Sequence, residues 1–233
     1  MAFHSELGGC TSGQLSGSAV TLIVPVGSTE QHGPHLPLDT DTRIATAVAR
    51  RVAEQSAHLL APAIAYGASG EHQDFPGTVS IGTAALTAVL VEYGRSACEW
   101  AARLVFVNGH GGNTDALRAA TATLRAEGRD AGWCSGWAPG GDAHAGHTET
   151  SLLLHLSPHL VRRDRWVTGN REPLAVLMPT LRRDGIGAVS SSGVLGDPTT
   201  ATAEAGAQIF AEMVADCARR MQQWNPDRGG MLR

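Results

Sequence analysis

Residues 19–41 read AVTLIVPVGSTEQHGPHLPLDTD, an apolar run followed directly by a polar cluster. The apolar part, 19–26, is typical of a buried strand. The polar part places Glu30, His32 and Asp41 just beyond it. A folded domain gains no stability by crowding ionisable groups at a strand end, whereas a metal ion needs nitrogen and oxygen ligands that converge from a rigid support. The stretch therefore predicts a strand that carries a metal site at its end.

Strand-like and helix-like segments alternate along the rest of the chain. Strands are expected at 19–26, 59–65, 103–107 and 130–135, and helices at 40–55, 83–101, 114–127, 148–156 and 203–224, with loops at 66–82 and 165–200. This alternation predicts an α/β fold with a mostly parallel sheet covered by helices. Sites in such sheets form in the loops beyond the carboxyl ends of the strands, where 27–41 and 108–113 both lie.

The composition restricts the class of protein. We expect one domain over residues 1–233, with a flexible Gly/Ser-rich arm at 1–18. Charged residues make up 17%, below the usual ~25%, so part of the surface is expected to be buried in a homo-oligomer. The net charge of −4 points to neither nucleic acid nor an anionic membrane. Without a signal segment, an apolar run of membrane length or paired cysteines, the chain is expected to be cytoplasmic.

Three of the candidate ligands come from the first loop. Glu30 and His32 are two residues apart and point the same way in an extended segment. Asp41 returns at the start of the next helix, where its two oxygens could bridge two cations. His110 follows a separate strand among glycines that let the backbone approach a ligand closely.

Each candidate also has a structural interpretation. Asp41 could cap its helix, and Glu149 could favour the dipole of the helix that it begins. His35 is expected to be structural or on the surface rather than a ligand. Of His144 and His147, one is expected to be catalytic and the other supporting or structural. The remaining histidines resemble ordinary helix or loop residues: His4, His58, His72, His155 and His159.

Together these motifs resemble the creatininase, or creatinine amidohydrolase, family. The matching stretches are GSTEQHGPHLPLDTD (27–41), EHQDFPGTVSIG (71–82), LVFVNGHGGN (104–113), HAGHTETS (144–151) and GVLGDPTTAT (193–202). The resemblance implies a three-layer α/β/α sandwich, a metal-dependent hydrolase of C–N bonds and, often, a hexamer. It implies metal ligands at Glu30, His32, Asp41, His110 and Glu149, with Asp41 bridging.

The sequence departs from creatininase proper at Gly112, where that enzyme carries a glutamate ligand. The ligand must then come from elsewhere, and Glu149 is the candidate. The motif GHGGN at 109–113 is similar to the corresponding motif in formamide hydrolases of flavin-type biosynthesis and in the mycofactocin branch of the family. The length and the HAGHTETS context look most like that branch, which releases a C-terminal Val-Tyr-derived unit from a ribosomally made, modified precursor peptide.

We therefore expect a metal-dependent amide or peptide hydrolase that uses two divalent ions, Zn, Fe or Mn. His144 would give a proton to the leaving nitrogen, and Glu149 would belong with it to the catalytic set. Trp133 and Trp137 could form an apolar wall for an aromatic C-terminal residue, unless one of them is core. The alternatives are a creatinine amidohydrolase, a formamide deformylase or a non-catalytic metal-binding scaffold.

Overall fold

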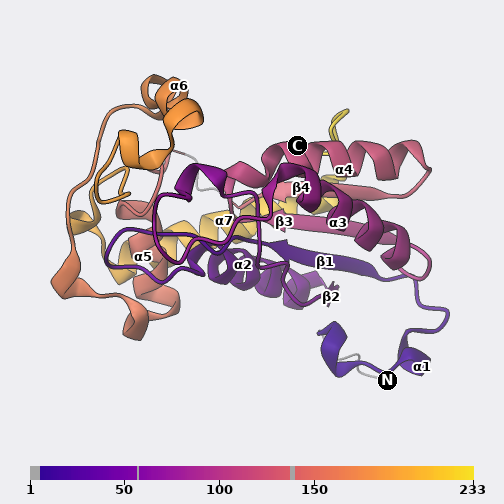
Figure 1. Cartoon of the computed structure of the whole chain (residues 1–233). Coiled ribbons are helices and arrows are strands. Elements are labelled where there is room, and N and C mark those ends of the chain that lie inside the picture. The colour runs from indigo at the N-terminus through magenta and orange to yellow at the C-terminus, as the bar shows by residue number, and fades with distance from the viewer. Residues whose placement is uncertain (1–5, 57, 137–139) are drawn as a thin grey trace.

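A parallel sheet of four strands lies at the centre of the computed structural model, which describes residues 6–56, 58–136 and 140–233 (Figure 1). Its strands are β1 (Thr21–Val26), β2 (Leu59–Leu60), β3 (Arg103–Asn108) and β4 (Ala131–Ser135), in the order β2-β1-β3-β4. The pairing of β1 with β3 runs from Thr21 opposite Arg103 to Val26 opposite Asn108. Both strands therefore end at the same edge of the sheet. The strand predicted at 59–65 is shorter than expected, and its distal part keeps only an isolated bridge from Ile64 to Val26.

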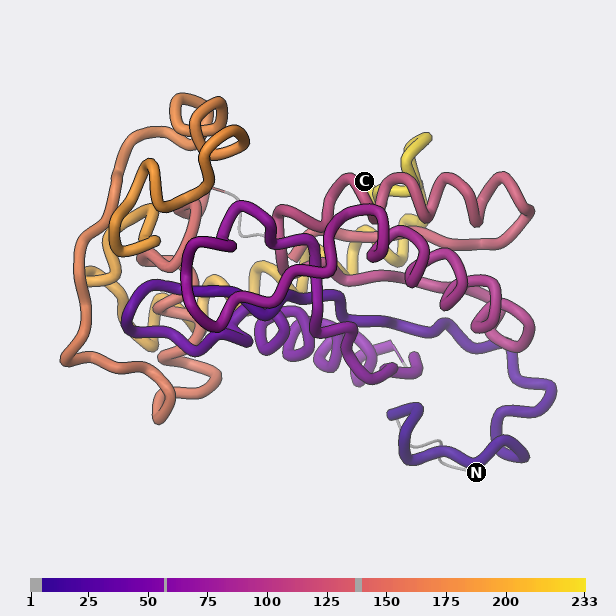
Figure 2. Tube along the Cα trace, viewed as in Figure 1, coloured from indigo at the N-terminus to yellow at the C-terminus, as the bar shows by residue number. Residues whose placement is uncertain are grey.

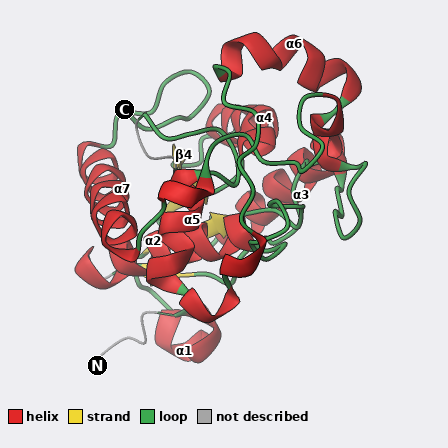
Figure 3. Ribbon diagram, turned by 90° about the vertical axis from the view of Figure 1, so that its left-hand side faces the viewer, coloured by secondary structure: helices red, strands yellow, loops and turns green. Residues whose placement is uncertain are grey.

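Helices cover both faces of this sheet. The α-helices of the described residues are α1 (Ser12–Leu15), α2 (Thr40–Ser56), α3 (Gly82–Ala97), α4 (Thr114–Ala126), α5 (His147–Leu156), α6 (Leu174–Asp184) and α7 (Ala203–Gln223). Figure 3 shows α2 and α7 on one side of the strands and α3 and α4 on the other. The predicted three-layer α/β/α sandwich is confirmed.

Alternating side chains of β1 divide the core in two. Ile23 points into a cluster with α2, α5 and α7, whereas Leu22 and Val24 point into a cluster with α3 and α4. The stripe Ile44, Val48, Val52 on α2 lies in the first cluster, as its helical spacing predicts. Because both faces of the sheet are covered, its strands are apolar along almost their whole length.

The segment 165–200 differs from the loop that the sequence suggested. It contains α6, which continues through Pro179, and a short 3-10 turn at Ile186–Ala188. Leu177 joins Ile186 and Leu195 in a small apolar cluster that is separate from the two main ones. Figure 2 shows this orange segment at the end of the molecule away from the N-terminus. It lies beyond the carboxyl ends of β1 and β3.

The described part of the predicted N-terminal arm contacts the core. Leu7 and Leu15 pack against the cluster that contains α3 and α4. Glu6 forms an ion pair with Arg50 on α2 and a strand-like bridge with Leu60. These contacts fix the entry of the chain into β1.

Candidate metal centre

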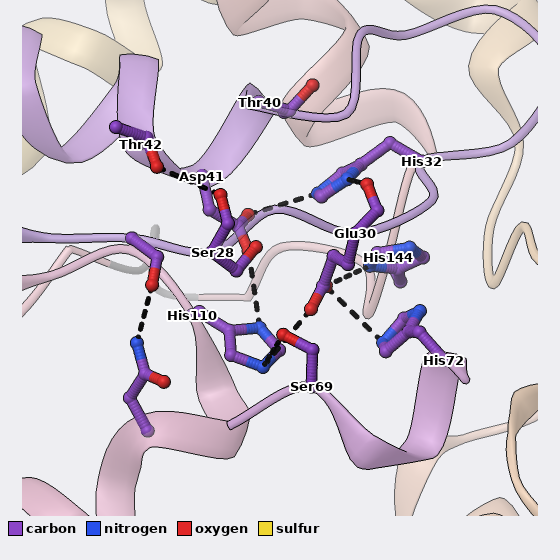
Figure 4. Close-up of polar contacts among 12 residues, drawn as sticks. Ser28, Glu30, His32, Thr40, Asp41, Thr42, Ser69, His72, His110 and His144 are labelled. Carbon is purple, nitrogen blue, oxygen red and sulfur yellow. Dashed lines mark hydrogen bonds and ion pairs between the residues drawn. The ribbon is translucent and has the colours of Figure 1, made fainter. Parts of the chain in front are cut away.

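The ends of β1 and β3 bring four predicted ligands together below the protein surface. Glu30 and His32 come from the loop after β1, and Asp41 from the first turn of α2. His110 directly follows β3. Their exposed fractions are 0%, 0%, 2% and 5%, respectively, so water is almost excluded from them. Figure 4 shows the four side chains converging on one point.

Local hydrogen bonds fix the shape of the first loop. The backbone N–H of Glu30 donates to the carbonyl of Leu38 at 3.0 Å, which closes the loop on itself. Nδ1 of His32 lies 3.1 Å from the carbonyl of Glu30, and Gly33 turns the chain with a φ of 64°. The loop thus holds Glu30 and His32 on a rigid frame.

Asp41 lies between two imidazoles. Its Oδ1 is 3.0 Å from Nε2 of His32, and its Oδ2 is 3.2 Å from Nδ1 of His110. The hydroxyl of Ser28 also donates to Oδ2 at 2.7 Å. This arrangement suits a carboxylate that bridges two cations, which is the role predicted for Asp41. A residue that only capped the helix would not need these contacts.

The pKa shifts of the cluster indicate a site that favours positive charge. Burial would raise the pKa of Asp41, but His32 and His110 hold it well below its usual range. Burial would lower the pKa of His32, but Asp41 and then Glu149 raise it to about 10. The pKa of His110 is raised against its burial by Glu30 and Asp41. In the metal-free protein, protons on the imidazoles therefore balance the carboxylates, and cations would displace them.

Glu30 gives the clearest sign that a cation belongs here. Both of its carboxylate oxygens are buried without a hydrogen-bond partner, an arrangement that is costly unless a positive ion compensates it. Three groups of side chains have ligand atoms close enough to share one ion: Glu30, Asp41 and His110; His32, His144 and Glu149; and Glu30, His72 and His144. Carboxylate and imidazole ligands suit Zn, Fe and Mn, so the donor set fits divalent metal.

The fifth predicted ligand, Glu149, comes from a helix that supplies none of the other four. Glu149 is in the first turn of α5, and its Oε2 lies 3.8 Å from Nε2 of His32. The same oxygen accepts the backbone N–H of Ala145 at 2.6 Å, and burial raises the pKa of Glu149 to about 7. All five predicted ligands therefore lie in one cluster.

His144, which precedes α5, and His147, which begins it, have different surroundings. His144 is buried against the cluster, with its Nδ1 3.9 Å from Oε1 of Glu30. His147 instead contacts Thr200, with 2.9 Å between its Nδ1 and the hydroxyl oxygen. His35 is also outside the candidate ligand groups among the described residues, and its Nε2 contacts the hydroxyl of Thr150 at 2.9 Å. Only His144 of this pair faces the metal centre.

Two residues of the site were not identified from sequence. Glu71 and His72 lie in a 3-10 turn, Gly70–His72, that faces Glu30. Nε2 of His72 is 3.3 Å from Oε1 of Glu30, and Oε1 of Glu71 is 3.6 Å from Nε2 of His110. The stretch 71–82 was identified as a family motif within a predicted loop, but nothing in its spacing indicates that a side chain reaches the end of a remote strand.

The absence of a side chain at Gly112 leaves room for Glu71 beside His110. A Cβ atom at position 112 would lie 2.3 Å from the carbonyl of Ala68, 2.5 Å from Nε2 of His110 and 2.7 Å from Oε1 of Glu71. The space that a side chain would fill at 112 is therefore taken by the turn that carries Glu71. The acidic group beside His110 on this side is therefore Glu71.

A cavity of about 1010 Å³ opens over the cluster. One side is lined by Glu30, Asp41, His110, His144 and Glu149, and the opposite side by α6 and the residues after it, including Leu174, Met178, Leu181 and Ile186. Trp133 does not form its wall, contrary to one of our expectations. It is 3% exposed in the core, where its Nε1–H donates to the carbonyl of Gly229. Trp137 lies outside the described residues.

The chain resembles known proteins in sequence and in fold. The family model for creatininase, described as creatinine amidohydrolase, matches residues 11–221. The mycofactocin precursor peptide peptidase of Mycobacterium tuberculosis (strain ATCC 25618 / H37Rv) is 65% identical, covering 97% of this chain and 94% of the relative. A crystal structure of creatinine amidohydrolase superposes with a TM-score of 0.80 at 29% identity, covering 96% and 99% of the two chains. A mutant creatininase of Zn–Zn type gives the same TM-score, identity and coverage. Within the described residues, no helix is long and apolar enough to cross a membrane.

Proposed function

Because the chain belongs to the creatininase family of C–N hydrolases, we propose that it is the metal-dependent peptidase that acts on the mycofactocin precursor peptide. It would cleave near the C-terminus of the modified peptide and release the Val-Tyr-derived unit. The high identity to peptidases of that name over almost the whole chain supports this assignment.

The size of the cavity is the observation that carries the choice of substrate. At about 1010 Å³ it lies at the upper end of ligand pockets, far beyond what one small flat ring such as creatinine fills. Gly111 and Gly112 line it without side-chain bulk, and Leu174 and Met178 add apolar surface. This shape suits a stretch of peptide with an apolar side chain.

Two ions can be assigned to this chain's residues. Glu30, Asp41 and His110 would hold one. His32 lies 3.0 Å from Asp41 and 3.8 Å from Glu149, and these three would hold the other, with Asp41 shared. Zn, Fe and Mn remain the candidates, and the Zn–Zn creatininase favours a two-ion site. When bound, the ions would lower the pKa of water and polarise the scissile carbonyl.

His144 would move the proton. Its Nε2 lies 2.8 Å from the backbone carbonyl of Gln31, which can only accept, so Nε2 carries the hydrogen. Burial lowers the pKa of His144 well below its usual value, which keeps the ring neutral and Nδ1 bare. Nδ1 would first take a proton from the attacking water and then give it to the leaving nitrogen. The sequence predicted that His144 acts as a general acid. In this proposal it acts first as a general base and then as a general acid.

Turnover measurements test the proposal. Purified protein, loaded with Zn, Mn or Fe(II), would be given the modified precursor peptide, creatinine and a formamide in parallel, with products identified by mass spectrometry. We expect efficient cleavage of the peptide alone, loss of activity with EDTA and recovery on adding metal. Efficient creatinine turnover with an inert peptide would refute the substrate, and an inert loaded protein would favour a scaffold.

We also propose a homo-oligomer, either a hexamer or another dimer-based assembly. Several large apolar side chains are exposed on the single chain: Leu38, Tyr66, Val79, Val89, Val167, Leu174 and Val176. Contacts between subunits would cover part of this surface. A mass near 24.3 kDa in light scattering at micromolar concentration would contradict the assembly.

A further inference from the structure

The amide of Gln31 lies at the centre of a buried hydrogen-bond network that the proposed mechanism does not use. Gln31 is 4% exposed and stands between His72 and His144 on the wall of the metal centre. Its Nε2 is 2.9 Å from Nδ1 of His72, 3.1 Å from Nε2 of His144 and 3.2 Å from the carbonyl of Gly193. These three neighbours compete for two hydrogens.

The orientation of this amide is fixed from both sides. The backbone N–H of Gly33 donates to Oε1 of Gln31 at 2.8 Å, so the oxygen cannot be exchanged with the nitrogen. A Cβ atom at Gly193 would lie 2.1 Å from the same oxygen, so the amide fills a space that only glycine leaves there. Nε2 therefore faces the two histidines and acts as a donor.

The positions of the ring hydrogens follow from this orientation. Nε2 of His144 is already the donor to the backbone carbonyl of Gln31, so it cannot accept from the amide. One amide hydrogen goes to the carbonyl of Gly193, and the other goes to Nδ1 of His72. The neutral His72 ring must then carry its hydrogen on Nε2. That atom lies 3.3 Å from Oε1 of Glu30.

We propose that Gln31 is a positioning residue that keeps Nδ1 of His72 as an acceptor, so that its Nε2–H faces Glu30, and thereby excludes His72 as a metal ligand. The group of Glu30, His72 and His144 then does not hold an ion, although its atoms are close enough. The Nε2–H of His72 then lies 3.3 Å from one oxygen of Glu30, and the other oxygen, 3.2 Å from Nε2 of His110, faces the ion. The first contact is not a hydrogen bond in the metal-free structure. We expect it to become one when an ion fixes Glu30, because metal-ligating carboxylates are commonly hydrogen-bonded. This inference rests on the proposed metal centre but not on its substrate.

Nitrogen-15 NMR of histidine-labelled, metal-free protein tests the inference directly. We expect His72 with its hydrogen on Nε2 in the unchanged protein and on Nδ1 in Gln31→Glu, whose carboxylate needs a donor. His144 should keep its Nε2–H in both, because its partner is backbone. Gln73→Glu, an exposed change of the same charge beside His72, is the matched control and should leave both rings unchanged. A hydrogen on Nδ1 of His72 in the unchanged protein would overturn the proposal.

Metal binding gives a second test that does not depend on activity. His72→Ala should still bind the same number of ions at saturation, with affinity reduced by roughly 10–100-fold as for other outer-shell partners. Gln31→Met, which removes the donor but keeps the shape, should weaken binding by a similar factor. If His72→Ala loses one ion even at saturating metal, then His72 is a ligand and the proposal is wrong. Failure of peptide cleavage alone would affect only the proposed function.

Discussion

The loop 27–41 and the segment 165–200 face each other across one cavity but are built differently. The first is a rigid loop at the end of β1, with Glu30, His32 and Asp41 buried and held by short hydrogen bonds. The second carries α6 on a small apolar cluster of its own and leaves Leu174 and Val176 exposed. Reactive groups thus lie on the rigid side, and apolar contact surface lies on the other.

This difference suggests a division of roles between chemistry and selection. A ligand set must be held within a fraction of an ångström, which strand ends and a helix start can provide. A surface that contacts a substrate side chain tolerates more change, because it acts through area rather than through exact position. Substitutions on the two sides should therefore have effects of different size and kind.

The largest effect is expected for Asp41→Ala. Removing the shared carboxylate leaves both ions short of a ligand, so metal content should fall and turnover should drop by more than about 10³-fold. Elemental analysis and kcat on the same preparation would measure both. Gln31→Ala should lower metal content less, and Asp39→Ala, which removes an exposed partner of Arg43, should leave it unchanged. A full complement of ions in Asp41→Ala would refute the shared role.

His144→Ala tests the proton step without dismantling the centre. We expect the metal content to be retained while kcat falls by roughly 10²–10⁴-fold, the usual worth of a positioned acid–base group. His147→Ala should be nearly normal, because the His147 ring contacts Thr200, outside the cluster. The reverse pattern in these two variants would transfer the role to His147.

The two regions also differ in how far the sequence predicted them. Glu30, His32 and Asp41 were identifiable because a buried strand, a fixed turn and a helix start follow one another within a short stretch. α6 was not, because Pro179 interrupts its helical pattern and its apolar residues pack on the distant Ile186 and Leu195. His72 was missed for a similar reason, since its partner Glu30 is remote in sequence.

A substitution on α6 should affect binding more than chemistry. Leu174 lines the cavity, whereas Val176 is more exposed and does not line it. Leu174→Ser should raise KM for the peptide by about 10-fold through lost apolar contact, with kcat nearly unchanged. Val176→Ser is the matched control and should behave as the unchanged protein. An equal fall in kcat for Leu174→Ser would mean that α6 shapes the reacting geometry itself.

The smallest predicted effect is on the stability of the fold at acidic pH. We expect it to come from the loop 27–41, through His35. His35 is fully buried, its Nδ1 lacks a partner, and burial together with positive charge on His32 lowers its pKa to about 4. A histidine whose pKa is lower in the folded chain than the unfolded value of about 6.5 stabilises the fold above pH 6.5. That contribution is lost progressively as the pH falls towards 4, and the shift sets an upper limit of about 3–4 kcal/mol.

We therefore expect the Tm of His35→Gln to fall less between pH 7 and pH 4.5 than that of the unchanged protein, although its Tm at pH 7 is no higher. His159→Gln, an exposed residue of the turn Pro158–Leu160, should follow the unchanged protein over the same range. Parallel curves of Tm against pH for His35→Gln and the unchanged protein would show that His35 does not make the rigid loop sensitive to acid.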